Sequence, residues 1–217
     1  MPDAREAMLD RIRSALGDVA QTNPAVEYAA ISRTYIRAGR LDLEARLHLL
    51  KDRLRDYDTN VVETSPASLP RTIAEILHSH QQKKVIAADG LPPEILPRES
   101  PSPITFIPER EATLDDLNAC DGIVTVCTVA IAFTGTIVLT HVPGEGARRL
   151  TLVPDRHLCI VRAEQVVETV PEAMDRLAPL ATQPLTLISG PSATADIEMT
   201  RIRGVHGPRF LDVVLVR

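Results

Sequence analysis

A stretch near the end of the chain combines the residue types of a small-ligand site with those of a turn. Residues 187–210 read LISGPSATADIEMTRIRGVHGPRF, so an apolar run stops at a glycine–proline pair and small polar residues follow. Glycine lets a ligand approach the backbone, and hydroxyl groups can bond the oxygens of an anion. We expect a small anionic ligand to be bound by the small residues of this stretch, which are Gly190, Ser192, Thr194, Gly204 and Gly207.

Two residues of the same stretch can exchange protons. His206 stands two residues after one glycine and directly before another, and its imidazole suits proton transfer near neutral pH. Asp196 can accept a substrate proton, orient a hydroxyl or cap a backbone turn. We take both as candidate catalytic residues. The alternative is that the aspartate caps a turn and the histidine only bonds nearby carbonyl groups.

A second set of hydroxyls lies in the middle of the chain. Thr134, Gly135 and Thr136 interrupt a long apolar segment, so they predict a turn that presents hydroxyls and backbone donors. In a mainly parallel sheet, the carboxyl ends of buried strands lie on one edge. We therefore expect this turn to share one cleft with the residues of the 187–210 stretch.

The composition excludes several other kinds of site. The formal net charge is −5 and aromatic residues make up 3%, which argues against a nucleic-acid partner. The sequence lacks the glycine-rich phosphate-binding motifs and the nucleophile-elbow motif. The cysteines, Cys120, Cys127 and Cys159, lack zinc-ligand spacing and are typical of small buried side chains. We predict no metal and no cofactor.

One segment needs to be tested as a membrane span. Residues 122–140, GIVTVCTVAIAFTGTIVLT, carry no charge, but they are rich in threonine and β-branched residues and contain a turn signal. Two buried strands joined by a short turn explain them better. The N-terminal residues lack the apolar core of a signal peptide, so we predict a cytoplasmic protein with no membrane partner.

The elements that must position these residues alternate between strands and helices. Helical patterns cover residues 5–16, 43–54, 70–77, 113–118 and 169–177, and strand patterns cover residues 84–89, 103–108, 150–154, 157–162, 185–189 and 210–216. This order predicts an α/β fold with a mainly parallel sheet covered by helices. We expect an N-terminal helical extension over residues 1–40, with weak periodicity over 18–40, and an α/β domain over residues 41–217.

The first helical pattern carries an apolar stripe formed by Met8, Ile12 and Leu16. A short isolated helix is marginal in water, so the stripe requires a partner. We expect the extension to pack either on the domain or on another subunit of a homo-oligomer.

The quoted segments together resemble the lactate-utilization protein C family, whose domain is called LUD. SGPSATADIE, GVHGP and the apolar C-terminal strand are similar to the end of that family. AIAFTGTIVL and LVPDRHLCIV are similar to its centre, and MLDRIRSALG to its first helix. The resemblance implies a fold similar to the superfamily of ribose-phosphate isomerase, glucosamine-phosphate deaminase and CoA-transferase.

The same resemblance implies a function. It suggests an accessory subunit of a system that oxidises L-lactate to pyruvate, with partner proteins that carry the iron–sulfur clusters. The alternative hypotheses are an autonomous enzyme acting on a phosphorylated, folate or CoA-linked substrate, and a structural partner without a ligand. Phe133 stands where the family commonly has glutamate, so a role of that glutamate does not transfer to this chain.

Overall fold

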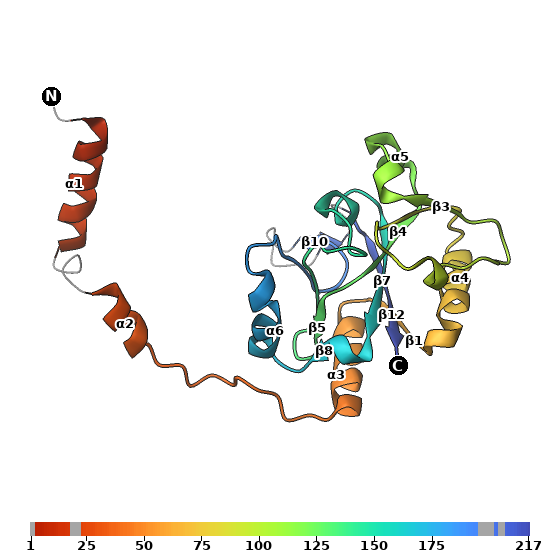
Figure 1. The fold of residues 1–217 in the computed structure, drawn as a ribbon, viewed down its shortest axis with the longest axis horizontal. Coiled ribbons are helices and arrows are strands. Elements are labelled where there is room, and N and C mark those ends of the chain that lie inside the picture. Colours follow the sequence, from red (N-terminus) through yellow and green to blue (C-terminus); the bar gives the residue numbers. More distant parts are fainter. Residues whose placement is uncertain (1–2, 18–22, 195–201, 204–206) are drawn as a thin grey trace. The chain divides into compact units, whose positions relative to one another are not determined.

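The computed structural model describes residues 3–17, 23–194, 202–203 and 207–217. The chain divides into two compact units, residues 1–35 and residues 36–217 (Figure 1). The predicted boundary after residue 40 falls five residues later than this division.

The described residues of the first unit, 3–17 and 23–35, contain two short helices. Helix α1 (Ala4–Leu16) begins where the Asp3 carboxylate accepts a hydrogen bond from the Arg5 N–H, and it ends at Gly17 with φ of 51°. Helix α2 (Pro24–Ala30) begins at Asn23, whose side chain accepts from the Ala25 N–H. The weak periodicity of residues 18–40 predicted a linker or irregular arm and no helix. Helix α2 was missed because its start depends on an N-cap residue and a proline in the first turn, not on an apolar period. Neither helix contains a buried residue.

The second unit is built on a six-stranded sheet. Its order is β1 (Asn60–Thr64), β12 (Phe210–Val216), β7 (Arg156–Arg162), β4 (Gly122–Val126), β2 (Lys84–Ala87) and β3 (Thr105–Pro108). All the pairings in this sheet are parallel. The predicted α/β fold with a mainly parallel sheet is confirmed. The prediction did not include β1, whose short NVVET pattern is only half-buried.

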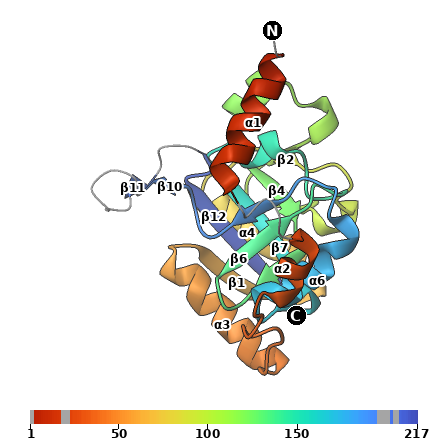
Figure 2. The ribbon, with the colours of Figure 1, turned by 90° about the vertical axis from the view of Figure 1, so that its left-hand side faces the viewer.

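A smaller sheet packs beside it, in the order β8 (Val166–Val167), β5 (Val129–Ile131), β6 (Thr136–Leu139) and β9 (Thr186–Ile188). Here β6 is antiparallel to both of its neighbours, and only β5 and β8 run parallel. The short strands β10 (Ala193–Thr194) and β11 (Ile202–Arg203) form an antiparallel pair that projects from the domain (Figure 2). The prediction did not include this second, mixed sheet.

Helices cover both sheets in layers. Helix α4 (Leu69–Ser79) packs on one face of the six-stranded sheet, with Ile73 and Leu77 fully buried. Helix α3 (Leu43–Asp56) packs against the other face and against the smaller sheet, with Leu50 and Leu54 fully buried. Helix α6 (Val170–Leu177) covers the outer face of the smaller sheet, and α5 (Leu114–Ala119) packs near β2 and β4. The buried apolar residues of α3 and α4 therefore face the core, whereas the stripe of Met8, Ile12 and Leu16 on α1 is exposed.

Two local predictions need correction. Residues 122–140 form three strands, β4, β5 and β6, rather than two. Residues 150–154, predicted as a strand, begin inside a 3-10 turn at Arg148–Thr151, because Leu150 turns inward to become fully buried.

The cysteines are free and buried, as predicted. Within the described part of the chain, no helix has the length and apolar character needed to cross a membrane.

Candidate functional site

Two of the predicted hydroxyl residues, Thr134 and Thr136, form a chain of hydrogen bonds with Ser189. Thr134 lies in the turn between β5 and β6, and its Oγ1 is 2.7 Å from Oγ1 of Thr136. Thr136 Oγ1 is also 2.8 Å from Oγ of Ser189, directly after β9. The end of β9 meets the start of β6 because these strands are antiparallel. The two predicted groups are thus joined at Ser189, but these hydroxyls already bond one another.

The glycines of these turns are explained by close packing. Gly135 has φ of 61°, and a Cβ there would lie 2.7 Å from Cβ of Arg53. Gly190 has φ of 82°, and a Cβ there would lie 2.5 Å from Cβ of Tyr57. Both glycines therefore allow their turns to press on the end of α3. The side chain of Phe133, beside the first turn, is 62% exposed and does not enter the core.

The remaining predicted residues lie along the chain after β9. The Ser192 N–H donates to the carbonyl of Pro208 at 2.9 Å, which brings Ser192 next to Gly207. Thr194 belongs to the backbone of β10. Asp196, Gly204 and His206 lie outside the described residues. The hollow beside Pro70, the two beside Asp89, the one beside Ser100 and the one beside Cys120 contain none of the predicted site residues that the structure describes.

A different place in the fold has the position expected for a ligand site. Along the chain, β2 connects outward to β3, and β3 then returns across β2 to β4. The strand order therefore reverses between β2 and β4, and in open α/β sheets ligands bind beyond the carboxyl ends of the strands at such a reversal. Asp89 and Gly90 follow β2 at this point, and Glu109 follows β3. We call the region the switch-point site.

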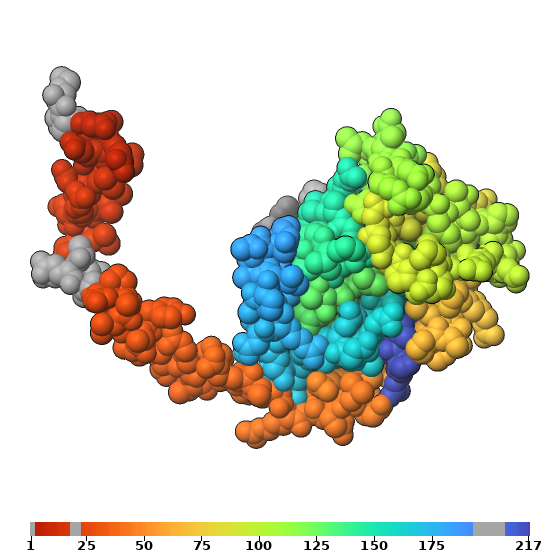
Figure 3. All heavy atoms as spheres, in the orientation of Figure 1, coloured from red at the N-terminus to blue at the C-terminus, as the bar shows by residue number. Residues whose placement is uncertain are grey.

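A loop formed by residues 140–147 closes over the switch point. The Gly144 N–H donates to the Asp89 carbonyl at 2.6 Å. The Glu109 carboxylate accepts from the Ala147 N–H at 2.8 Å and from the Asp89 N–H at 3.3 Å. On the face drawn in Figure 3, the yellow surface that follows β2 lies beside the green-teal surface of this loop. Backbone contacts thus fix the loop against the carboxyl ends of β2 and β3.

The loop itself is held from inside by a buried carboxylate. Glu145 is 1% exposed, and its oxygens accept from the Thr128 hydroxyl at 2.6 Å and from the Thr140 N–H at 2.5 Å. Burial raises the pKa of Glu145 because the charged form loses its hydration, and these hydrogen bonds only partly oppose that effect. Glu145 is therefore an anchor of the loop and is out of reach of a ligand.

His141 lies on the wall of the site with both ring nitrogens engaged. Its backbone has φ of 60°, Nδ1 is 2.7 Å from the Gly146 carbonyl, and Nε2 is 2.9 Å from Oγ1 of Thr186. Since a carbonyl only accepts, Nδ1 carries the proton in this arrangement. His141 therefore bridges the loop and β9 in a fixed orientation.

Together these residues surround an open hollow of about 590 Å³. Its lining is Asp89, Gly90, Glu109, His141, Val142, Pro143, Gly146 and Ala147. A second, mainly apolar recess of about 160 Å³ shares Asp89 and Gly90 with it. Arg110, at the rim of this recess, forms an ion pair with Asp89 at 3.3 Å. The site can therefore accept hydrogen bonds at two carboxylates, and it has one guanidinium at its edge.

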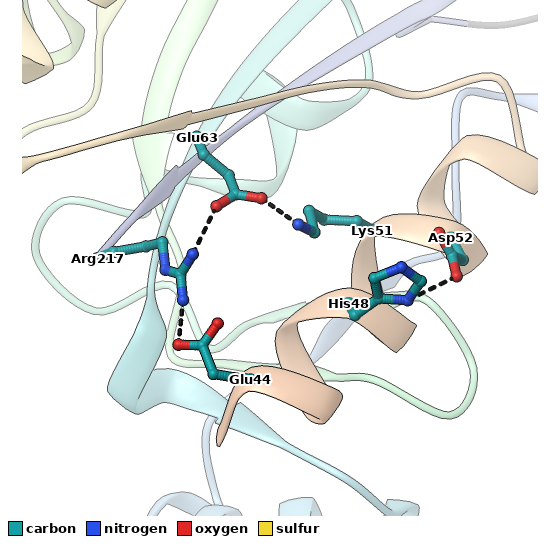
Figure 4. Close-up of polar contacts among 6 residues, drawn as sticks. All are labelled: Glu44, His48, Lys51, Asp52, Glu63 and Arg217. Carbon is teal, nitrogen blue, oxygen red and sulfur yellow. Dashed lines mark hydrogen bonds and ion pairs between the residues drawn. The ribbon is translucent and has the colours of Figure 1, made fainter. Parts of the chain in front are cut away.

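Two other polar clusters do not offer a comparable site. At the far end of the same sheet edge, Arg217 pairs with Glu44 and Glu63, and Lys51 also pairs with Glu63 (Figure 4). The hydrogen bond from Lys51 lowers the pKa of Glu63. These charges satisfy one another and tie α3 to the ends of β1 and β12. Cys127 and Cys159 are at most 2% exposed, so no ligand reaches their thiols.

The sequence contains a signal for the switch-point site that our prediction did not use. The strand pattern at residues 84–89 ends in Asp89-Gly90, and PITFIP is followed at once by Glu109. Ligands bind beyond the carboxyl ends of the strands in a parallel sheet, so a carboxylate after each of two strand patterns predicts a binding site there. No local pattern in residues 140–147 shows that this loop returns to β2.

Comparisons with known proteins place the chain among related sequences. The LUD domain profile matches residues 47–216. A lactate utilization protein C from Deinococcus radiodurans is 41% identical over 172 residues, which cover 78% of this chain and 79% of that protein. Another from an Exiguobacterium strain is 30% identical and covers 98% of this chain and 95% of its own length. The crystal structure of a DUF162 family protein from Deinococcus radiodurans superposes with a TM-score of 0.70 at 35% identity, covering 82% of this chain and all of that one.

Proposed function

Because the chain belongs to the LUD domain family, we propose that it acts in lactate utilization, as an accessory subunit of a system that oxidises L-lactate to pyruvate. The name lactate utilization protein C, carried by relatives that align over almost the whole chain, supports this role. The proposed partners are iron–sulfur-cluster proteins of the same system, and the proposed place of action is the cytoplasm. This chain then supplies binding and positioning, while its partners supply the redox centres.

The observation that carries a ligand-binding role is the hollow at the switch point. It lies where the strand order reverses, and its carboxylates, Asp89 and Glu109, are held in place by Arg110 and by backbone N–H groups. A hydroxy acid could donate its hydroxyl to one of these carboxylates and direct its own carboxylate towards Arg110. Tight binding of a simple anion is not favoured, since the hollow has more acids than bases in its lining.

The residues after β9 remain a second location for an anion. Gly190, Ser192 and Gly207 lie near one another, and Thr194 follows them on β10. The proposed proton-transfer groups there are Asp196 and His206. The turn at Thr134–Thr136 joins this group through Ser189. Binding at this group would involve the hydroxyls of Thr134 and Thr136 and the backbone at Gly135.

The test of the biological role is genetic and biochemical. Deletion of the gene should abolish or slow growth on L-lactate while growth on pyruvate continues, and the wild-type gene should restore growth. A tagged protein should co-purify with proteins that carry iron–sulfur clusters, recognised by their absorbance and iron content. Unchanged growth on lactate, with no iron-containing protein recovered, would reject the proposed role.

The test of the ligand role compares the two locations. Titration calorimetry with L-lactate should show binding that Arg110→Gln weakens, because Arg110 would pair with the lactate carboxylate, and that Ser192→Ala leaves unchanged. The opposite pattern would move the site to the residues after β9. The control variant Glu75→Gln alters an exposed carboxylate on α4 and should bind like the wild type.

A further inference from the structure

We propose that the switch-point site binds a neutral, hydroxyl-rich ligand with an attached ring, and that its chemical class is a nucleoside. This inference deepens the proposed function, because it uses the same hollow and names a ligand class for it. It depends on the size of the hollow, on the polar atoms that line it and on the character of the adjoining recess.

The size of the site exceeds what a three-carbon acid requires. The hollow measures about 590 Å³, and the recess that adjoins it at Asp89 and Gly90 adds about 160 Å³. Small-molecule sites that bury most of a drug-sized ligand typically measure roughly 300–1,000 Å³. L-Lactate would leave most of this space to water, so a larger ligand makes better use of the site.

The polar side chains that line the hollow call for hydrogen-bond donors on the ligand. Asp89 and Glu109 are carboxylates, and ionised carboxylates only accept. The ring nitrogens of His141 are already bonded to Gly146 and Thr186. Each carboxylate oxygen has more than one acceptor direction, so the bonds from Arg110 and from the backbone leave acceptor capacity. A ligand must therefore present hydroxyl or amino groups.

The charges favour hydroxyls over an ammonium group. The charge of Asp89 is balanced by Arg110 at 3.3 Å, and the Glu109 carboxylate is stabilised by two backbone N–H groups. A cationic ligand would have to displace or approach the guanidinium of Arg110. Two adjacent hydroxyls match the two oxygens of a carboxylate, and an acidic residue near the carboxyl end of a strand plays this part for ribose in dinucleotide-binding folds. Asp89 occupies such a position after β2.

The recess supplies an apolar surface for a ring. It is lined mainly by Leu91, Pro93, Leu96, Phe106 and Pro108, with Arg110 at its rim. The side chain of Phe106 comes from β3 and is half-buried, so it offers part of its ring to the recess. Aromatic and apolar side chains hold planar rings by burying their faces. A ribose at Asp89 would place its base towards Phe106, because Asp89 lines both the hollow and the recess.

The experiment is titration calorimetry on the full chain with adenosine, 2′-deoxyadenosine, spermidine and L-lactate as separate probes. Adenosine should bind, and loss of one hydroxyl in 2′-deoxyadenosine should weaken binding about tenfold or more. The variants Asp89→Asn and Phe106→Ala should each weaken adenosine binding about tenfold, while Glu75→Gln should leave it unchanged. Circular dichroism melting of each variant confirms that it is folded.

Several results would overturn the inference. A ribose at this carboxylate is ruled out if adenosine does not bind. It is also ruled out if 2′-deoxyadenosine binds as tightly as adenosine, or if Asp89→Asn leaves the affinity for adenosine unchanged. Stronger binding of spermidine would show that the site prefers a cation. Binding of L-lactate without adenosine would reject the nucleoside and support lactate as the ligand. Growth on L-lactate tests the proposed role separately, so a failure of one is distinguishable from a failure of the other.

Discussion

The backbone N–H of Gly144 donates to the carbonyl of Asp89 at 2.6 Å, which joins two segments far apart in the sequence. Gly90, next to Asp89, has φ of 91°, and a Cβ there would lie 2.5 Å from Cβ of Pro143. The turn after β2 and the loop of residues 140–147 thus fit together only without a side chain at position 90. This contact forms one wall of the switch-point site.

Gly90→Ala should destabilise the domain by about 1–3 kcal/mol, because it combines an unfavourable backbone conformation with a clash against Pro143. Urea unfolding followed by circular dichroism measures this loss. The matched control is Gly17→Ala, where φ is also positive, at 51°, but nothing lies within 4 Å. The control should cost about 1 kcal/mol or less in its own helix and leave the domain transition unchanged. Equal effects on the domain would contradict the contact.

Glu145→Gln should reduce the dependence of stability on pH. The folded state raises the pKa of Glu145, so it binds a proton more tightly than the unfolded chain. The wild-type free energy of unfolding should therefore fall as pH rises from the usual glutamate pKa, near 4.3, through the raised value. Glutamine keeps a carbonyl acceptor for the Thr140 N–H and does not titrate. Urea midpoints measured between pH 4 and pH 8 should show a shallower fall for the variant, and identical slopes would disprove the assignment.

Arg156→Ala should be far more damaging than Arg209→Ala. Arg156 bonds the fully buried carboxylate of Asp212 at 2.7 Å, and its own side chain is 14% exposed. Removal of one partner of a buried ion pair costs about 3–5 kcal/mol, because the other charge stays buried. Arg209 pairs with Asp155 at the surface, where such a pair contributes about 0–1 kcal/mol. Similar unfolding free energies for the two variants would show that Asp212 finds other compensation.

Thr136→Val tests whether the hydroxyl chain at β6 is structural. The substitution keeps the shape of the side chain but leaves Thr134 and Ser189 without their shared partner. We expect a loss of about 1–2 kcal/mol in the free energy of unfolding and no change in ligand affinity at the switch-point site. A stable variant that no longer binds ligand would instead assign the turn to the binding site.

Removal of residues 1–35 tests the apolar stripe of α1. Met8, Ile12 and Leu16 are each at least 48% exposed, and an isolated helix of this length is marginal in water. We expect truncation to lower the assembly mass measured by light scattering if the stripe binds another subunit. An unchanged mass with increased binding of a hydrophobic dye would indicate packing on the domain. If the truncated protein keeps the same mass, solubility and melting temperature, residues 1–35 pack on neither the domain nor another subunit and act only as a tether.

Local signals in the sequence determined most of the helices and strands. Thr169 and Glu172 form the capping box that begins α6, and Pro70 lies in the first turn of α4. Alternation and apolar runs identified the long strands β7 and β12, because burial of a strand depends on its own side chains. The parallel character of the main sheet followed from the alternation of strands with helices.

Only the tertiary structure decided which strand ends meet. The sequence placed Thr134–Thr136 and Ser189–Ser192 at strand ends, but their contact arises from the antiparallel pairing of β6 with β9. Asp89, Glu109 and Ala147 come together because β2 and β3 are neighbours and a distant loop returns to them. Strand order and loop closure depend on contacts between residues far apart in the chain, and such contacts leave no periodic pattern in either segment alone.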